Sequence, residues 1–207
     1  MKRLVFVFVL AIASLQSYAQ TAQEDGRHCG QSSRNFEQII ASCTHLLAGA
    51  NDFDRMIILN YRAMAYMDKG DTDSAISDLS ELIRLRPSAT VYELRGTQRQ
   101  DKGQQDKAAA DFEEAEARGM NTIRHYLRLA FAHMKLNQED RAMRDLNFAL
   151  LVDPASVTAL YWRGLLWQRK DDHRAALVDF DTALLLSPDV SEIVAARARS
   201  QTRLNSK

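Results

Sequence analysis

Hydrophobic and polar positions recur along the chain in a fixed order. The segments 73–87, 140–154 and 174–188 each carry apolar residues at helical spacing and end on a proline. These are the three prolines of the whole sequence. Because proline cannot continue a helix, each one marks the end of an amphipathic helix. A fourth copy, 106–120, has Gly119 near its end, a residue suited to a helix C-cap.

The four copies align with a nearly constant period. An aspartate occupies the same repeat position in each, at intervals of 33, 34 and 34 residues: Asp78, Asp111, Asp145 and Asp179. Upstream of each copy lies a second helical pattern with a small residue at one position, namely Ala63, Gly96, Ala130 and Gly164. A period in this range is typical of solenoids, in which each helix pair buries its apolar face by stacking on the next pair.

The repeat resembles the tetratricopeptide repeat. The family pattern has a large residue, a small residue four later, an aromatic residue three after that, and then Ala, a bulky residue and Pro. The last copy fits it best, with Leu160, Gly164, Trp167, Ala176, Phe180 and Pro188. The second copy departs from the pattern, with Arg99 at the aromatic position and no proline, so we expect it to be the least well packed. The resemblance implies an all-α, right-handed superhelical solenoid of antiparallel helix pairs.

These patterns divide the chain into consecutive segments. We expect a signal peptide at 1–19 and an N-terminal segment at 20–55 with a partial repeat and a cysteine pair. The residues 35–47 resemble the second helix of a repeat, but the polar segment before them offers no first helix. Four full repeats follow at 56–88, 89–122, 123–156 and 157–190, and a C-terminal capping helix at 191–207.

The N-terminus predicts export. Lys2 and Arg3 precede an apolar run, and small residues at Ser17 and Ala19 follow it, which is the pattern of a secretory signal cleaved after Ala19. The apolar run is short for a membrane span, so an uncleaved anchor is the weaker interpretation. We therefore expect an exported protein, periplasmic or secreted, with no membrane span after cleavage.

The two cysteines of the sequence lie near this end. Cysteines of exported proteins normally pair, so we predict a disulfide between Cys29 and Cys43 that folds the N-terminal segment over an otherwise uncovered helix. The alternative is a zinc site formed by both cysteines with His28 and His45. Adjacent His28 and Cys29 are awkward ligands for one tetrahedral ion, and their spacing matches no zinc finger.

Charge and motifs argue against other classes of function. After signal cleavage 25 basic residues face 27 acidic ones, so there is no electrostatic reason to expect nucleic acid. No sequence motif for a metalloprotease, an esterase nucleophile or a phosphate-binding loop is present. His125 and His133 follow the helical pattern and are read as packed between helices. We therefore expect no enzyme, no cofactor and no metal.

The resemblance implies a protein-interaction module. In this family the first helices of successive repeats line a concave groove, which would here bind an extended or helical segment of a partner, with Phe131 and Tyr161 as anchors. The alternative is a structural subunit of a cell-envelope assembly that uses its convex face or its ends. Some members bind a chaperone's C-terminal carboxylate, and Arg124 and Arg128 match their basic pair, but Met64 and Leu94 replace the asparagines. The predicted partner-binding residues are Met64, Glu93, Arg124, Leu127, Phe131, Met134, Tyr161 and Leu165.

Overall fold

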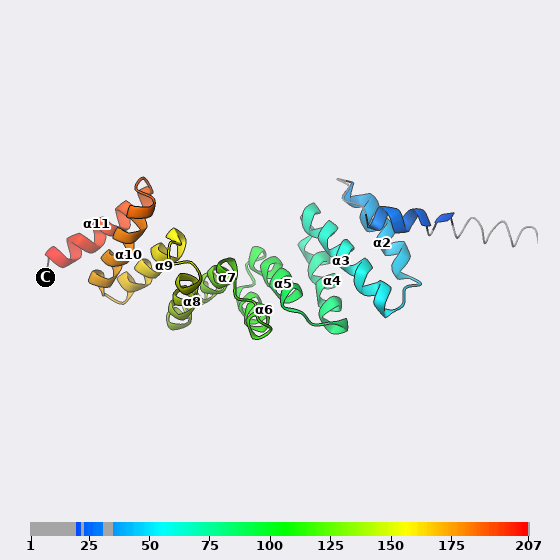
Figure 1. The fold of residues 1–207 in the computed structure, drawn as a ribbon, viewed down its shortest axis with the longest axis horizontal. Helices are drawn as coiled ribbons and strands as arrows, with labels where there is room; N and C mark the ends of the chain where they lie inside the picture. Colours follow the sequence, from blue (N-terminus) through cyan, green and yellow to red (C-terminus); the bar gives the residue numbers. More distant parts are fainter. Residues whose placement is uncertain (1–19, 22, 31–34, 207) are drawn as a thin grey trace, which may run out of the picture. The chain divides into compact units, whose positions relative to one another are not determined.

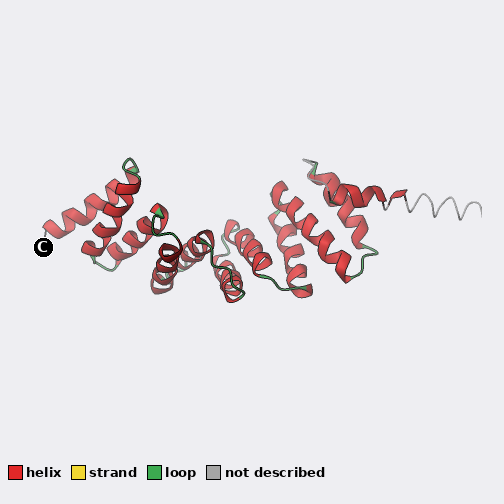
Figure 2. Cartoon of the chain, in the orientation of Figure 1, coloured by secondary structure: helices red, strands yellow, loops and turns green. Residues whose placement is uncertain are grey.

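A computed structural model describes residues 20–21, 23–30 and 35–206, and within these residues all regular structure is helical (Figures 1 and 2). The expected signal peptide, 1–19, lies outside the described residues. Short loops join successive helices, and the predicted fold class, an all-α solenoid of helix pairs, is confirmed. The helices are α2 (Phe36–Leu47), α3 (Asp52–Lys69), α4 (Thr72–Leu85), α5 (Ala89–Asp101), α6 (Gln105–Ala117), α7 (Ile123–Lys135), α8 (Glu139–Val152), α9 (Val157–Arg169), α10 (His173–Leu186) and α11 (Ser191–Asn205).

The helices form two compact units. Unit 1 runs to Gln98 and unit 2 begins at Arg99, so the boundary falls inside α5. It therefore lies in the second repeat, where the sequence departs most from the repeat pattern.

In unit 1, α3 packs against α2 on one side and α4 on the other. The core between α3 and α4 is built from Leu59, Ala63, Leu79 and Leu82, all of them buried. The helix α3 begins at Asp52, four residues before the predicted start of the repeat, because the Asn51 side chain caps it by accepting a hydrogen bond from the Asp54 amide at 3.0 Å.

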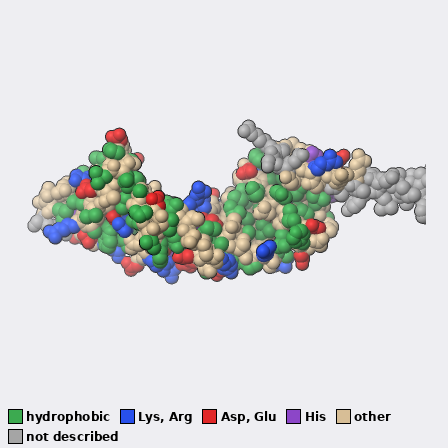
Figure 3. All heavy atoms as spheres, in the orientation of Figure 1, with side chains coloured by type: hydrophobic (Ala, Val, Ile, Leu, Met, Phe, Trp, Pro, Cys, Tyr) green, Lys and Arg blue, Asp and Glu red, His purple; other side chains and the backbone are tan. Residues whose placement is uncertain are grey.

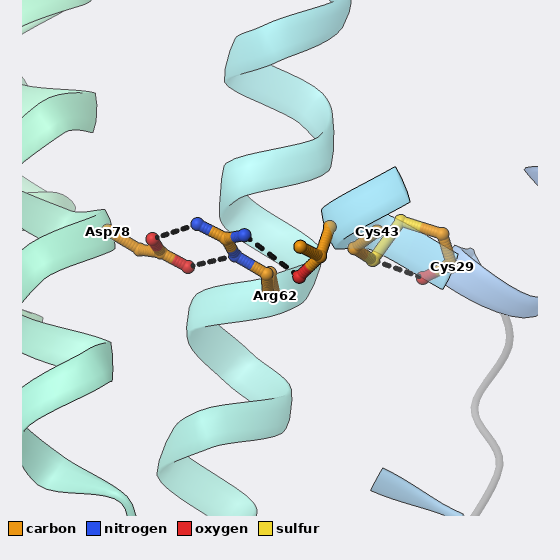
Figure 4. Close-up of a disulfide and its surroundings, with 5 residues drawn as sticks. Cys29, Cys43, Arg62 and Asp78 are labelled. Carbon is orange, nitrogen blue, oxygen red and sulfur yellow. Dashed lines mark hydrogen bonds and ion pairs between the residues drawn. A yellow bond between two sulfur atoms is a disulfide. The ribbon is translucent and has the colours of Figure 1, made fainter. Parts of the chain in front are cut away.

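The N-terminal segment differs from the sequence prediction. Residues 23–29, expected to provide no first helix, are helical, and a disulfide joins Cys29 to Cys43 of α2 (Figure 4). Both cysteines are buried, together with Ile39 and Ala65. One turn earlier, the Asp25 carboxylate lies 2.5 Å from His45 Nδ1. The sequence of this helix lacks the apolar stripe by which a helix is recognised from sequence. A covalent bond and a polar contact hold it in place instead.

Unit 2 is a continuous series of helix pairs from α6 to α11, each packed on the next. One core cluster lies between α7, α8 and α9 around Leu146 and Leu166, and another between α9, α10 and α11 around Phe180 and Ile193. The helix α11 buries Ile193, Ala196 and Ser200 against the last repeat. It therefore covers the apolar end of the unit, as a terminal cap of a repeat array must.

The recurring aspartates each pair with a basic side chain from the first helix of the same repeat. In the first and fourth repeats this is an arginine that forms two hydrogen bonds: Arg62 to Asp78 at 2.7 and 2.8 Å, and Arg163 to Asp179 at 2.7 and 2.9 Å (Figure 4 for the first pair). Asp78 holds the pKa of Arg62 above its usual value through these hydrogen bonds, against the opposing effect of burial. All four aspartates are buried, so each pair links the two helices of a repeat across their interface.

The second and third repeats use a different position for the same contact. Arg99 reaches Asp111 at 2.8 Å, and His133 Nδ1 lies 2.5 Å from Asp145. Arg99 and His133 both occupy the aromatic position, one helical turn after the position of Arg62 and Arg163. This contact explains why the second repeat departs from the family pattern at Arg99.

A close approach between helices depends on Gly164. A Cβ atom added there would lie 2.4 Å from Cε1 of Phe180, far inside van der Waals contact. Across the repeats, the size of the residue at the first position varies inversely with the size of the residue at the second. Where the first is glycine the second is phenylalanine, as at Gly96 and Phe112, and where the first is alanine the second is leucine, as at Ala63 and Leu79. The sequence therefore keeps the summed volume of these two positions similar from repeat to repeat.

Candidate functional sites: one groove in each unit

Buried titratable groups in the described residues serve packing and pairing. The His125 ring lies edge-on between Phe112 and Tyr126, with ring centroids 6.2 and 5.3 Å away, and His133 is paired with Asp145. Among residues 20–206, without the gaps, no group of three or more His, Cys, Asp or Glu is placed to hold a metal ion. Cys29 and Cys43 share a disulfide, so neither is available as a thiolate ligand for the zinc alternative.

Unit 2 contains a groove of about 500 Å³. Its walls come from the end of α5, the start of α6, and the helices α7 and α9. Its lining combines aromatic, cationic and amide side chains: Gln100, Asp101, Gln105, Arg124, Leu127, Arg128, Phe131 and Trp162. This mixture of an apolar wall with a few polar groups is typical of sites that orient a bound chain.

Aromatic contacts hold the apolar wall of this groove in place. The rings of Phe131 and Trp162 lie 5.9 Å apart between centroids, and Lys135 Nζ lies 5.2 Å from the Phe131 centroid. On the opposite wall the Gln100 amide donates to the Arg128 carbonyl at 3.1 Å. Arg124 is exposed at the margin, so the groove offers a fixed aromatic pair beside an accessible cation.

Unit 1 contains a second groove, of about 610 Å³, between α3 and the segment that joins α4 to α5. Figure 3 shows hydrophobic side chains gathered over α3 and α4. The groove is lined by Phe53, Met56, Ile57, Asn60, Tyr61, Leu82, Arg86, Ser88 and Val91. Four large apolar side chains of α3 are strongly exposed: Phe53 at 67%, Ile57 at 43%, Tyr61 at 40% and Met64 at 50%.

The structure brings some of the predicted partner-binding residues together. Arg124, Leu127 and Phe131 line the unit 2 groove. Met134 and Leu165 are half-buried against the neighbouring core clusters, and Met64 is exposed on α3 of unit 1.

Two of the predicted partner-binding residues are less exposed than the sequence suggested. Glu93 is only 8% exposed, so its side chain lies largely inside the structure, whereas the sequence-based hypothesis placed it on the groove surface. Tyr161 is half-buried, and its ring lies 6.3 Å from that of Phe180 in the core. Tyr161 therefore contributes to packing as well as to the surface of α9.

The predicted partner-binding set does not include one repeat position that lines both grooves. Tyr61, Arg128 and Trp162 occupy equivalent positions in the first, third and fourth repeats, and each of them lines a groove. The position carries a large residue in every repeat, including Leu94 in the second. That regularity was a usable signal, whereas the buried state of Glu93 depends on how neighbouring helices close over it.

Comparisons with known proteins give a consistent fold. Residues 59–88 match the family model described as tetratricopeptide repeat. No curated protein sequence matches the chain. Among solved structures, MamA from Desulfovibrio magneticus RS-1, from residue 41 to its end, is 19% identical with a TM-score of 0.66, over 85% of this chain and 96% of that chain.

Two further similar structures are of proteins that bind peptides. YrrB, a tetratricopeptide repeat protein with an unusual peptide-binding site, is 17% identical with a TM-score of 0.71, over 79% of this chain and 84% of that one. The first tetratricopeptide repeat domain of Spaghetti, bound to an HSP90 peptide, is 19% identical with a TM-score of 0.54, over 57% and 94%. At such low identity the likeness shows a shared fold.

Proposed function

This chain is built from tetratricopeptide repeats, and on that basis we propose that it is a non-enzymatic interaction protein that binds a segment of a partner protein in the unit 2 groove. The observation that carries the proposal is the fixed pair of Phe131 and Trp162 beside exposed Arg124. Aromatic residues and arginine are enriched at protein interfaces, where a few such anchors supply most of the binding energy.

The chemistry of the groove describes the segment that it fits. An apolar side chain would pack on the Phe131 and Trp162 rings, and a carboxylate or carbonyl oxygen would accept a hydrogen bond from Arg124. Peptide binding by YrrB and by the Spaghetti domain supports this use of the fold. The anchors differ from the sequence-based hypothesis, because Trp162 replaces Tyr161 as the partner of Phe131.

We also propose that the protein works outside the cytoplasm. The basic residues, apolar run and small residues of 1–19 support this location, and a disulfide is stable in an oxidising compartment. Intact-mass measurement of the exported product should give a chain that begins at Gln20. A soluble cytoplasmic product that retains Met1 would contradict the proposal.

A second candidate function is a structural role in a cell-envelope assembly. It is favoured by exposed leucines at equivalent positions near the ends of two second helices, Leu151 at 78% and Leu185 at 84%. These residues lie outside the lining of the unit 2 groove. They provide an alternative surface on which a larger assembly would pack.

One capture experiment distinguishes the two functions. The full-length protein is immobilised and exposed to the envelope fraction, beside a groove variant, Arg124→Glu with Phe131→Ala, and a matched surface variant, Leu151→Ser with Leu185→Ser. We expect the groove variant to lose the captured partner and the leucine variant to retain it, with helix content unchanged by circular dichroism. Loss in the leucine variant alone would favour the assembly role and contradict binding in the groove.

A further inference from the structure

The helix α3 of unit 1 is apolar on two faces. One face is buried in the core through Leu59 and Ala63, as expected for a helix of a repeat. The other, which we call the α3 face, consists of Phe53, Ile57, Tyr61 and Met64, and all four are exposed. Exposed apolar patches of this kind mark interaction sites in soluble proteins.

The spacing of these residues makes the α3 face a straight ridge. Phe53, Ile57 and Met64 are separated by four and seven residues, so they lie on one side of the helix. At a rise of 1.5 Å per residue, eleven residues extend roughly 16 Å. This length corresponds to about three turns of a second helix, which would present apolar residues at the same intervals.

A groove runs beside this ridge and gives the binding surface depth. Met56 of α3, Leu82 of α4 and Val91 of α5 line it together with Phe53 and Ile57. The Ser88 hydroxyl accepts a hydrogen bond from the Val91 amide at 3.4 Å, which fixes the start of α5 at the groove margin. The lining of the groove is therefore mainly apolar, with Asn60, Arg86 and Ser88 as its polar residues apart from the Tyr61 hydroxyl.

Charge at the margin specifies the occupant. Arg86 is the one charged residue that lines this groove. The neighbouring arginines differ from it, because Arg55 and Arg84 both lie against Glu81, at 2.6 and 3.8 Å. Among the described residues Arg86 forms no ion pair, and it is exposed, so its charge is available to a bound partner.

We infer that the α3 face and its groove bind an amphipathic helix of a partner protein, with the apolar stripe of that helix on Phe53, Ile57 and Met64 and an acidic residue against Arg86. The inference concerns unit 1 and does not rest on the proposed function of the unit 2 groove. Apolar complementarity supplies affinity, and the charge pair fixes the direction in which the helix lies.

Two synthetic probes test the inference on the full-length protein. One is an amphipathic helix of about 18 residues, long enough to keep helical structure, with a leucine stripe and a glutamate at its edge. The other is the same peptide with lysine in place of that glutamate. We expect the glutamate peptide to bind about tenfold more tightly by fluorescence anisotropy, since an opposite-charge contact replaces a repulsive one. Methyl signals of Ile57 and Met64 should shift on binding.

Variants of the protein sharpen the test. Arg86→Glu should reverse the preference between the two peptides, whereas Arg84→Glu, a matched change at the arginine beside Glu81, should leave it unchanged. Ile57→Ser with Met64→Ser should weaken both peptides at least about tenfold, while Leu185→Ser in unit 2 should not. Circular dichroism of each variant checks that the helices remain.

Several outcomes would overturn the inference. Equal affinity for the two peptides, or no binding of either, would remove the acidic amphipathic helix as the occupant. Methyl shifts at Leu127 and Met134 without shifts at Ile57 would place binding in unit 2. Concentration-dependent sedimentation of the protein alone that Ile57→Asp abolishes would show that a second copy of the chain covers this face.

Discussion

At the scale of single residues, Gly164 leaves no room for a side chain beside the Phe180 ring. In a solvent-exposed helix, replacing glycine by alanine stabilises the fold by about 1 kcal/mol, because glycine loses more backbone entropy on folding. At Gly164 a Cβ atom would meet the Phe180 ring at 2.4 Å, so the effect of the substitution should change sign.

We therefore expect Gly164→Ala to lower the free energy of unfolding by about 1–3 kcal/mol, the usual range for an overpacked core. Gly26→Ala is the matched control, because Gly26 is helical and no atom lies within 4 Å of its added Cβ; it should stabilise or be neutral. Urea denaturation measures both variants.

The partner substitution follows from the other repeats. Because Ala63 faces the position of Leu79, Gly164→Ala combined with Phe180→Leu should be less destabilising than the sum of the two single changes. The double-mutant cycle should give a favourable coupling on the order of 1 kcal/mol. Additive effects would show that the ring moves away without strain and would contradict the volume-balance argument.

A second residue-scale prediction concerns Asp25. The hydrogen bond with His45 lowers the pKa of the Asp25 carboxyl, against the opposing effect of burial. A lowered pKa in the folded state means that this contact stabilises the fold at pH values above the ordinary carboxyl range and is lost as pH falls through the lowered value. His45→Ala should therefore raise the pKa of Asp25 toward its ordinary value.

Carboxyl-carbon NMR titration of the full-length protein measures this change directly. Asp140 is a suitable internal reference, because its pKa is lowered by Lys170 at a separate place and should not respond to His45→Ala. An unchanged Asp25 titration in the variant would show that the contact with His45 does not control its ionisation.

At the scale of helices, the disulfide determines whether the N-terminal helix stays on α2. The repeat pattern puts Cys43 at the core position of Leu79 and Phe180 and puts Cys29 before the helix, so the sequence by itself predicts that Cys43→Ser is more destabilising than Cys29→Ser. In the structure Cys29 is 3% exposed and Cys43 is fully buried. Either serine would place a hydroxyl in an apolar cluster, so the two variants should be similarly destabilised.

Each variant should lose about 3 kcal/mol, the contribution of a cross-link that closes a loop of this length, together with the cost of the buried hydroxyl. Chemical denaturation with and without reductant checks the size of the loss, and wild type with reductant serves as the control that keeps both sulfurs. Thiol labelling of both cysteines in the native, non-reduced protein would show instead that no disulfide is present.

Most helices could be predicted because the repeat supplies several copies of each signal. Asp71 and Asp172 cap the start of the second helix in the first and fourth repeats, and a proline follows the end of the second helix in three repeats. A local ambiguity in one copy is therefore settled by the others. The N-terminal helix has no such copy. Its residues 23–29 show no apolar stripe, and it is held by the disulfide and by Asp25, which are contacts between segments that no local pattern encodes.

The groove residues were predictable only in part for a related reason. Repeat positions show which side of a helix a residue occupies, and Arg124, Leu127 and Phe131, which share a predicted side, all line the unit 2 groove. Their role in binding a partner stays a prediction. Exposure depends on the neighbouring helices as well. Glu93 occupies the same repeat position as Leu127 and is buried, while Trp162 lies one position after Tyr161 and lines the groove.

At the scale of the whole molecule, the two units carry different probes of unfolding. Both tryptophans of the sequence, Trp162 and Trp167, are in unit 2, whereas the disulfide is in unit 1. In repeat proteins each repeat is stabilised by itself and by its nearest neighbours, so a local loss of stability need not spread through the chain. Reduction should therefore act mainly on unit 1.

We expect a reductant to lower the midpoint of the part of the helix-loss transition that comes from unit 1, because the denatured chain regains the entropy that the cross-link removes. The tryptophan fluorescence transition should keep its midpoint. Circular dichroism and fluorescence, followed together during thermal unfolding, give both quantities. Equal shifts in the two signals would show that the units unfold as one cooperative body.

The two ways of pairing the recurring aspartates bear on how such repeats can change during evolution. Arg62 and Arg163 reach the aspartate from one position, and Arg99 and His133 reach it from the next turn. The second repeat carries arginines at both positions: Arg99 binds Asp111, while Arg95 donates to the Ser80 hydroxyl at 3.0 Å. A lineage could therefore gain the second arginine before losing the first, and move between the two arrangements without ever leaving a buried carboxylate unpaired.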